Sequence, residues 1–529
     1  MGTLGAMQDF PLRIMRLMDH AEREHGQREI VAARADGTVV RTNWKTVAHA
    51  ARRLAQGLER LGVRPGERVA TLAMNHDRHL VAWFGVVGMG GVLHTLNPRL
   101  FDDQLTYIIN HAEDVVIFYD RAFAPIIERL KPQLTATRHF ICFEDEFDAL
   151  LAVEDGDYRW VEGDERDPCG LCYTSGTTGN PKGVVYEHRA TVLHAMSVIA
   201  PDIFDLSARS VILPVVPMFH ANSWCLPYAV AIAGSKLVIC GDNRPEHLCE
   251  LFNREGVTHT AGVPTVWLGM IDHVEHSGAS LGKLRLVIIG GSSAPPATIR
   301  WFRERGIHVN HLWGMTEMTP VGTMSGIPGQ ETGLEPQEAY TRRALQGLPI
   351  PFVEIRARGA DGLIPWDGRT MGELEVRGPS VSSAYYASDE GTDRWTDDGW
   401  FRTGDVVSIH SDGFVEVQDR AKDLVKSGGE WISTVALENA LMGHPSVAEA
   451  AVIAVPDEKW SERPLAVVVL KEGEAVSPEE LRDFLAPDFA KWWLPERFEF
   501  VEEIPKTAVG KFRKTALREQ FAQQPAETA

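Results

Sequence analysis

Residues 42–74, TNWKTVAHAARRLAQGLERLGVRPGERVATLAM, contain a complete helix-to-strand unit and decide the fold class. Five apolar residues in this stretch recur at the spacing of a single helical face: Val47, Ala51, Leu54, Leu58 and Leu61. Gly62 is placed to end the helix, and Pro65–Gly66 predict a turn into a strand over residues 68–74. Such a unit is typical of a sheet that is covered by helices.

The same alternation continues along the next two hundred or so residues. HLVAWFGVVGMGGVLHTLN (residues 79–97) and LTYIINHAEDVVIFYD (105–120) each read as a helix followed by a strand. Later β-branched runs, such as SVILPVVP (210–217) and LRLVIIGG (284–291), end in Pro or Gly. We therefore predict parallel strands between helices, with ligand-binding loops at the carboxyl ends of the strands.

The texture of the sequence changes at about Leu345, where short alternating strands with Asp-Gly turns predict antiparallel hairpins. A compact α+β segment follows residue 420. The prediction is an α/β protein with a large N-terminal domain of helix-covered sheets, residues 1–420. This N-terminal domain includes a β-rich subdomain at about 345–420. A small α+β domain spans residues 421–529.

The bulk composition excludes several classes of protein. A chain of 529 residues with a formal net charge of −20 lacks the positive field that general binding to nucleic acid or to anionic membranes needs. The sequence has no apolar run of membrane-spanning length and no secretory signal at its start, so we expect a cytoplasmic enzyme. Six cysteines are too few for a disulfide framework, and we interpret Cys169 and Cys172 as buried strand residues.

Residues 172–189, CYTSGTTGNPKGVVYEHR, form a loop rich in glycine and hydroxyl groups. It does not match the P-loop pattern G-x-x-x-x-G-K-[ST], because Lys182 follows a proline and precedes a glycine. Its composition still suits a phosphate, since glycines let backbone N–H groups approach an anion and hydroxyls add neutral donors or a metal ligand. We predict a nucleotide-phosphate loop of another type.

Six segments together resemble the adenylate-forming superfamily of acyl-CoA synthetases, luciferases and adenylation domains, in its order and approximate spacing. They are YTSGTTGNPKG (173–183), PMFHANSW (217–224), LWGMTEMTP (312–320), GWFRTGD (399–405), DRAKDLVKSGG (419–429) and PKTAVGKFRK (505–514). The chain looks most similar to bacterial medium- and long-chain fatty acyl-CoA synthetases and to methylmercaptopropionate-CoA ligases. The resemblance implies that a carboxylate is activated with ATP and Mg²⁺ as an acyl-adenylate, which then reacts with coenzyme A.

The resemblance also implies a nucleotide site. Its residues would be Thr174, Ser175, Gly176, Thr177, Thr178, Gly179, Lys182, Gly291, Ser292, Ser293, Trp313, Gly314, Thr316, Asp405 and Arg420. In this comparison the loop 174–182 clamps the β- and γ-phosphates, and Thr174 and Glu317 lie beside Mg²⁺. Trp313 would stack on adenine, Asp405 would accept the ribose hydroxyls, and Thr316 would lie near the α-phosphate.

Further roles follow from the same resemblance. Lys511 matches a lysine that bridges the carboxylate and the α-phosphate during adenylation, which with His220, Thr316 and Glu317 completes the predicted catalytic set. Lys422 occupies the hinge about which the C-terminal domain would rotate between the half-reactions. Three residues would contact coenzyme A: Lys426, Gly428 and Gly429.

The predicted acyl pocket comprises His220, Trp224 and Cys225 in HANSWCLPYA (220–229), where we expect a helix that places Trp224 and Tyr228 on one face. This stretch contains no acidic residue to pair with a substrate ammonium, so an apolar acyl tail is favoured.

Several alternatives stay open. The substrate could be an aryl acid or a short thioether acid of the methylmercaptopropionate type, and the acceptor could be a carrier protein. A luciferase-type monooxygenase is less favoured. A nucleotide-binding regulator without catalysis is disfavoured, because Glu317 and Lys511 are both present. Relatives in this branch are often homodimers, which makes a homodimer possible here.

Overall fold

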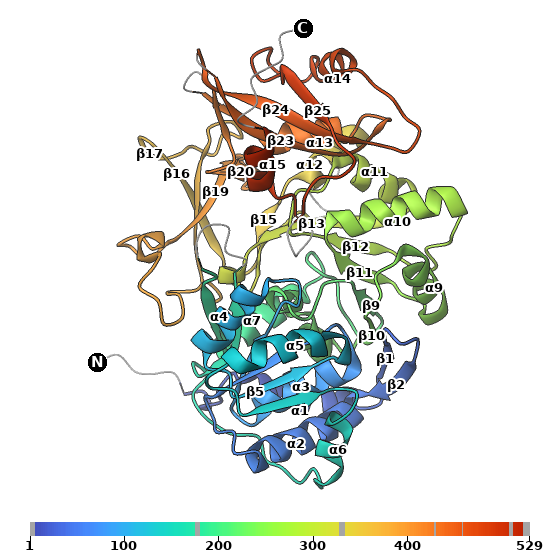
Figure 1. The fold of residues 1–529 in the computed structure, drawn as a ribbon, viewed down its shortest axis with the longest axis vertical. Helices are drawn as coiled ribbons and strands as arrows, with labels where there is room; N and C mark the ends of the chain where they lie inside the picture. The colour runs from blue at the N-terminus through green and yellow to red at the C-terminus, as the bar shows by residue number, and fades with distance from the viewer. Residues whose placement is uncertain are drawn as a thin grey trace. The chain divides into compact units, whose positions relative to one another are not determined.

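The computed structural model describes residues 6–174, 180–326, 334–427, 430–457, 459–506 and 511–521 (Figure 1). The chain forms two compact units. Unit 1 comprises residues 1–259, 315–321 and 379–392, and unit 2 comprises residues 260–314, 322–378 and 393–529.

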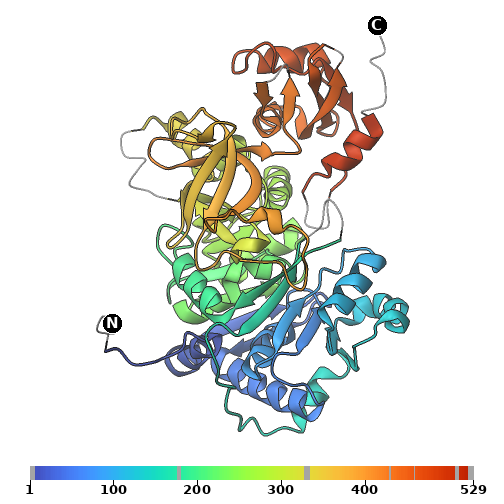
Figure 2. The ribbon, with the colours of Figure 1, turned by 90° about the vertical axis from the view of Figure 1, so that its left-hand side faces the viewer.

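Unit 1 contains a six-stranded sheet in the order β6-β5-β3-β4-β7-β8. Its strands are β3 (Arg68–Leu72), β4 (Val92–Thr95), β5 (Val116–Tyr119), β6 (His139–Cys142), β7 (Pro168–Tyr173) and β8 (Gly183–Glu187). They are parallel except β8, which runs antiparallel to β7. Helices lie on both sides of this sheet (Figure 2): α2 (Trp44–Arg60), α3 (Asp77–Gly88), α4 (Asp102–Ala112), α5 (Ala124–Leu130) and α6 (Phe147–Ala152).

The helix-to-strand unit predicted from residues 42–74 is confirmed as α2 followed by β3. Asn43 caps α2, because its side chain accepts the Thr46 N–H. The helix buries Val47, Ala51, Leu54 and Leu58, as the periodicity predicts.

Unit 1 also contains strands in the order β9-β10-β1-β2, of which β2 is antiparallel to β1. They are β1 (Glu29–Ala33), β2 (Val39–Asn43), β9 (Val211–Pro214) and β10 (Lys236–Cys240). The remaining α-helices of unit 1 are α1 (Ile14–His25), α7 (His188–Val198), α8 (Leu226–Ala233) and α9 (Pro245–Glu255). Its short 3-10 turns are η1 (Arg121–Phe123), η2 (Lys131–Gln133), η3 (Ala221–Cys225) and η4 (Thr316–Met318).

Unit 2 begins with a run of strands and helices. The strands β12 (Leu286–Ile289) and β13 (His308–Gly314) are parallel, and β14 (Val321–Met324) pairs antiparallel with β15 (Leu348–Pro349). Strand β11 (His259–Gly262) precedes them, and the helices are α10 (Pro264–Ser277), α11 (Pro296–Glu304) and α12 (Pro336–Ala344).

The predicted β-rich region is confirmed as a five-stranded antiparallel sheet in the order β17-β16-β18-β19-β20. Its strands are β16 (Glu354–Gly359), β17 (Gly362–Leu363), β18 (Gly372–Arg377), β19 (Phe401–Ile409) and β20 (Val415–Arg420).

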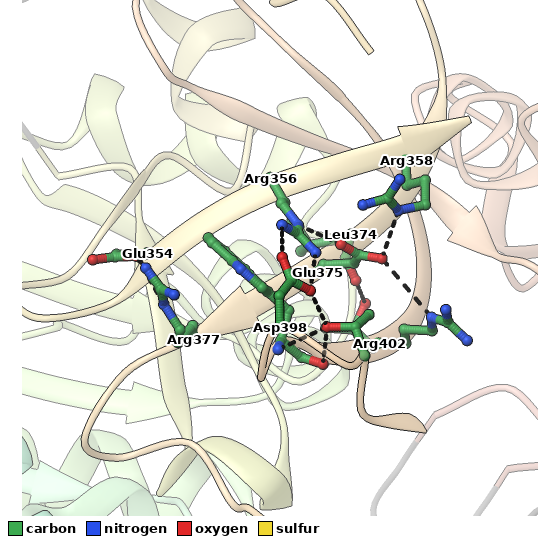
Figure 3. Close-up of polar contacts among 11 residues, drawn as sticks. Glu354, Arg356, Arg358, Leu374, Glu375, Arg377, Asp398 and Arg402 are labelled. Atoms are coloured by element: carbon green, nitrogen blue, oxygen red, sulfur yellow. Dashed lines mark hydrogen bonds and ion pairs between the residues drawn. The ribbon is translucent and has the colours of Figure 1, made fainter. Parts of the chain in front are cut away.

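One buried carboxylate ties three strands of this sheet together (Figure 3). The Glu375 side chain is 1% exposed and accepts hydrogen bonds from Arg356 and, at 3.0 Å, from Arg358. The Arg402 guanidinium lies 3.8 Å away. Arg356 also pairs with Asp398 at 2.6 Å.

We expect Glu375→Ala to lower the free energy of unfolding by about 3 kcal/mol, because it leaves several guanidinium groups without their shared carboxylate. Glu354→Ala is the matched control, since Glu354 pairs with Arg377 on the same sheet but both side chains are about half exposed. That change should cost at most about 1 kcal/mol. Thermal and urea unfolding of both variants measure the difference, and equal midpoints would contradict a structural role for the Glu375 cluster.

The C-terminal segment forms a sheet in the order β22-β21-β24-β23, with β25 beside β24. Its elements are β21 (Val425–Ser427), β22 (Glu430–Ile432), α13 (Thr434–Leu441), β23 (Val447–Asp457), β24 (Ser461–Leu470), α14 (Pro478–Leu485), β25 (Arg497–Phe500) and α15 (Lys514–Phe521). Alternate residues of β23 and β24 face two hydrophobic clusters, one with residues of α13 and α14 and the other with residues of α15. The predicted fold class, α/β with a β-rich subdomain and a small α+β domain, is confirmed.

Two smaller predictions can also be compared with the structure. Cys169 and Cys172 lie in β7 and are buried, as predicted, and burial raises the pKa of the Cys169 thiol to about 12. Within the described ranges, no helix combines the length and the apolar composition needed to cross a membrane.

Candidate active site

The base of the predicted phosphate loop is a closed hairpin end in unit 1. Strands β7 and β8 pair up to Tyr173 and Gly183. The Thr174 N–H then donates to the Lys182 carbonyl at 2.9 Å, and the Lys182 N–H donates to the Thr174 hydroxyl at 3.2 Å. The structure therefore sets Thr174 and Lys182 side by side, while the predicted residues 175–179 lie outside the described part of the chain.

The Lys182 ammonium at this loop base faces the segment 379–391. Its nitrogen lies 5.2 Å from the centroid of the Tyr385 ring and 4.0 Å from the Glu390 carboxylate. The backbone of Gly391 passes close by, because a Cβ atom there would lie 2.8 Å from the Lys182 nitrogen and 3.0 Å from the Tyr385 ring. Glycine leaves room for the lysine at this point.

Glu317, which was predicted to lie beside Mg²⁺, is in the η4 turn. Its side chain is buried, and its Oε1 accepts a hydrogen bond from the Tyr385 hydroxyl at 2.8 Å. Its carbonyl accepts the Ser382 N–H at 2.8 Å. The neighbouring Thr316 is buried too, and its carbonyl accepts the Tyr186 hydroxyl of β8 at 2.7 Å. The structure thus connects Glu317 and Lys182 through Tyr385.

Tyr385 and the segment that carries it were not predicted from the sequence. This segment is anchored to the loop base, since the Tyr386 N–H donates to the Gly183 carbonyl at 2.8 Å. It is anchored to the turn after Glu317 as well, because the Thr319 hydroxyl donates to the Ser380 carbonyl at 2.8 Å. Adjacent tyrosines before an acidic stretch and a glycine, SSAYYASDEG (382–391), were the available signal.

Two of the predicted acyl-pocket residues, Trp224 and Cys225, lie on an unusual left-handed turn, and the third, His220, directly precedes it in an extended conformation. Residues 221–225 all have positive φ, between 37° and 63°. Such a backbone costs non-glycine residues roughly 1–2 kcal/mol each, so its surroundings must hold it. The Thr95 hydroxyl bonds the Asn222 side chain at 3.4 Å, and the Ser223 N–H donates to the His220 carbonyl at 2.9 Å.

The expected helix through Trp224 and Tyr228 is therefore wrong. Helix α8 begins only at Leu226, because Pro227 is tolerated in the first turn of a helix but not in its interior. Trp224 and Cys225 are buried in the preceding turn, whereas Tyr228 packs on Trp83 and Phe84 of α3. Tyr228 is thus a core residue.

A second group of predicted residues converges in unit 2. Trp313, near the end of β13, donates its indole N–H to Asp405 Oδ2 at 2.8 Å. The Arg420 guanidinium lies 2.7 Å from Asp405 Oδ1, across the β19–β20 pairing. Gly314 ends β13 directly after Trp313. Asp405 is buried, and a carboxylate has about four acceptor positions, so these partners leave capacity for ligand hydroxyls.

The predicted adenine-side turn 291–293 follows β12 in the same unit. Gly291 has a φ of +90°, which favours glycine there. The Ser292 carbonyl lies 3.4 Å from the buried His311 ring, and the Ser293 hydroxyl accepts a hydrogen bond from Asn439 of α13 at 2.9 Å. Side-chain contacts therefore hold this turn on both sides.

The predicted C-terminal residues are more dispersed. The Lys426 nitrogen lies 4.5 Å from the Trp431 ring centroid, and Gly428 and Gly429 lie outside the described residues. Lys422 lies in the turn after β20, which the Asp423 N–H closes by donating to the Arg420 carbonyl at 2.8 Å. Lys511 is partly buried just before α15. The hinge, the boundary after residue 420 and the roles of these lysines stay predictions.

Lys514 differs from its neighbours in the basic run near the C-terminus. It is half-buried, with its side chain 11% exposed, and pairs with Asp419 at 3.0 Å and Glu438 at 2.8 Å, which joins α15, β20 and α13. Burial raises the pKa of Glu438 to about 7 against the opposing effect of Lys514. Lys514 therefore links three elements of this segment through its ion pairs.

The residues around Glu317 suit a magnesium ion that a nucleotide brings. The part of the chain that the structure describes has no cluster of three or more His, Cys, Asp or Glu that could hold a metal alone. Mg²⁺ usually takes one or two carboxylates and completes its shell with phosphates and water. The buried Glu317 carboxylate could provide such an oxygen ligand.

Comparisons with known proteins bear on the whole chain. Residues 18–386 match the model of the AMP-binding enzyme family, and residues 436–511 match the AMP-binding enzyme C-terminal domain. A long-chain-fatty-acid–CoA ligase of Thermus thermophilus is 47% identical, over 97% of this chain and 96% of that protein. A 3-methylmercaptopropionyl-CoA ligase of Ruegeria lacuscaerulensis is 45% identical, over 98% and 99%. The crystal structure of ATP-bound MatB from Rhodopseudomonas palustris is similar with a TM-score of 0.83 at 25% identity, over 97% and 99% of the two chains.

Proposed function

Because the chain belongs to the AMP-binding enzyme family, we propose that it is an ATP-dependent, AMP-forming acyl-CoA ligase for a medium- or long-chain fatty acid. One observation carries the proposal: Glu317 and the loop-base Lys182 both contact Tyr385, so a carboxylate that could hold a metal and a cation that could meet phosphates flank the same side chain. The full-length similarity to a long-chain-fatty-acid–CoA ligase supports the choice of substrate.

The proposed reaction has two steps. A carboxylate oxygen of the acid attacks the α-phosphorus of ATP, and the bond to the β-phosphate breaks, which gives acyl-AMP and pyrophosphate. The sulfur of coenzyme A then attacks the acyl carbonyl, loses its proton, and releases AMP. These steps mainly need positioning and charge neutralisation from the protein.

The residues of unit 1 would act on the phosphates and the acid. Lys182 and residues 175–179 hold the β- and γ-phosphates, and Thr316 lies near the α-phosphate. When it is bound, Mg²⁺ would neutralise phosphate charge, and Glu317 and Thr174 are the residues that would hold it. His220 is proposed to lie beside the reacting carboxyl group.

The residues of unit 2 would act on the nucleoside and on coenzyme A. Trp313 stacks on adenine beside Gly291, Ser292, Ser293 and Gly314, and Asp405 and Arg420 hold the ribose. Lys511 bridges the carboxylate and the α-phosphate during the first step. Lys422 is the proposed hinge, and Lys426, Gly428 and Gly429 contact coenzyme A in the second step.

The stretch 220–229 supports an apolar acyl chain, because it contains no acidic residue and buries Trp224. A short thioether acid is the second candidate, since the Ruegeria relative is named for that substrate. We also propose a cytoplasmic location and a possible homodimer, both of which stay predictions from the sequence.

A pyrophosphate-release assay over acids of about four to sixteen carbons, with and without coenzyme A, tests the proposal. Each buried CH₂ contributes about 0.8 kcal/mol, so kcat/KM should rise roughly fourfold per carbon until the pocket is full. An optimum at the shortest acids would favour the thioether acid. No pyrophosphate release with any acid would contradict the ligase activity.

Trp224→Ala should move this chain-length optimum towards longer or bulkier acids, because it removes a large apolar side chain without adding charge. Trp301→Ala is a control for the loss of a tryptophan, since Trp301 lies on α11 under Arg305. The same kcat/KM series on both variants measures the shift. If Trp224→Ala only lowers the unfolding temperature and keeps the wild-type preference, Trp224 is a core residue and not part of the pocket.

A further inference from the structure

We propose that Tyr385 is a positioning residue for the adenylation step, a role that rests on the proposed function. Its hydroxyl would orient the Glu317 carboxylate for a metal–nucleotide, and its ring would orient the Lys182 ammonium for the same phosphates. The structure places one aromatic side chain between two oppositely charged groups that the ATP phosphates need.

Glu317 needs a hydrogen-bond partner because its side chain is buried. This residue is 6% exposed, and a buried carboxylate is costly unless it is hydrogen-bonded. The Tyr385 hydroxyl donates to Oε1 at 2.8 Å, and Tyr385 is itself 8% exposed. Because this bond engages Oε1, Oε2 is the oxygen that could hold a metal. Partners of this kind fix the orientation of a metal ligand, and their loss typically costs 10- to 100-fold in metal affinity.

Lys182 lies against the ring of the same tyrosine. Its ammonium lies 5.2 Å from the Tyr385 ring centroid, within the range of a cation–π interaction. The Glu390 carboxylate is 4.0 Å away and its side chain is 70% exposed, so that ion pair is weak and screened. The ring thus holds the lysine without neutralising it, and an incoming phosphate can replace Glu390.

The segment that carries Tyr385 is anchored on both sides of this residue. Ser382 and Tyr386, on either side of it, donate their N–H groups to the carbonyls of Glu317 and Gly183, each at 2.8 Å. These two bonds fix the backbone to the metal-side turn and to the base of the phosphate loop. The backbone on both sides of Tyr385 therefore keeps its side chain in place against Glu317 and Lys182.

The test separates the hydroxyl from the ring. Tyr385→Phe removes only the hydroxyl, and Tyr385→Leu removes the ring as well. Tyr386→Phe and Tyr386→Leu are matched controls, because Tyr386 packs its ring on His111. Calorimetric titration would measure the Kd of ATP with Mg²⁺ and, separately, with EDTA in place of the metal. Thermal unfolding of each variant is recorded alongside.

We expect Tyr385→Phe to weaken binding of Mg²⁺–ATP by roughly 10- to 100-fold and to leave binding of metal-free ATP unchanged. Tyr385→Leu should weaken both, since Lys182 also loses its ring. Pyrophosphate exchange should fall with Mg²⁺–ATP binding, while thioester formation from synthetic acyl-AMP is retained. The Tyr386 variants should match the wild-type protein in these binding assays.

Glu317→Gln separates failure of this inference from failure of the proposed function. If Glu317→Gln weakens Mg²⁺–ATP binding and Tyr385→Phe does not, the positioning role of Tyr385 is overturned and the ligase proposal stands. If Tyr385→Phe weakens binding equally with and without metal, its role is merely structural and the inference also fails. If Glu317→Gln has no effect on Mg²⁺–ATP binding, the metal role of Glu317 fails, and the inference fails with it. Equal effects of Tyr385→Leu and Tyr385→Phe would overturn the role of the ring.

Discussion

Lys511→Ala is expected to slow acyl-adenylate formation by at least about a hundredfold, while thioester formation from preformed acyl-AMP is largely retained. The proposed contact of this cation with the carboxylate and the α-phosphate neutralises charge only in the first transition state. A contribution of roughly 3 kcal/mol there corresponds to a hundredfold or more in rate. Pyrophosphate exchange measures the first step, and synthetic acyl-AMP with coenzyme A measures the second.

Two lysines near Lys511 provide the comparison. Lys506→Ala is the matched control. Lys506 lies near Lys511, because it forms an isolated antiparallel β-bridge with Phe512, but its ammonium pairs with Glu449. This variant should leave both half-reactions near the wild-type rate. Lys514→Ala should instead lower stability, since it leaves Asp419 and Glu438 buried together without their cation. If Lys511→Ala slows both half-reactions equally, the bridging role is excluded.

Local patterns explain what could be predicted from the sequence. The α2–β3 unit follows from a single apolar stripe, the Asn43 cap and the Pro65–Gly66 turn, all of which act between near neighbours. The residues of the two candidate clusters could also be predicted, because Trp313, Asp405 and Glu317 each lie in a recognisable motif. Motifs identify residue types at fixed places, and the fold then brings some of them together.

Contacts that depend on distant residues could not be predicted in this way. Tyr385 meets Glu317 across 68 positions, and no local pattern connects them. Lys514 is a second such case, because its partner Asp419 lies 95 positions earlier. The left-handed turn at residues 221–225 was not predicted for another reason. Its sequence reads as helical, and only Pro227 indicates that the helix starts later.

Asp405→Ala is expected to slow both half-reactions by at least about a hundredfold, whereas Lys511→Ala should slow only the first. ATP and acyl-AMP carry the same ribose, so a carboxylate that accepts its hydroxyls serves both steps. Hydrogen bonds to a charged group contribute about 1.5–3 kcal/mol each, and two of them would be lost. The KM for ATP and the Kd for a non-reactive acyl-AMP analogue measure the effect.

The structure adds a second route by which Asp405 could act. Its carboxylate also holds the Trp313 indole at 2.8 Å and Arg420 at 2.7 Å, so its loss could act through a displaced Trp313 rather than through the ribose. Trp313→Phe removes the indole N–H and keeps an aromatic face, which isolates that route. We expect Trp313→Phe to weaken nucleotide binding less than Asp405→Ala does.

Deoxynucleotides separate the two routes decisively. A site built to bond a hydroxyl rejects the analogue that lacks it, so the wild-type protein should discriminate strongly against 2′-deoxy-ATP or 3′-deoxy-ATP. Asp405→Ala should abolish that discrimination, because the acceptor is gone, whereas Trp313→Phe should keep it. This comparison is a double-mutant cycle between a side chain and a substrate group. If Asp405→Ala weakens ATP binding and still rejects the deoxynucleotides as strongly as the wild-type protein, Asp405 positions Trp313 and Arg420 and does not bind the ribose.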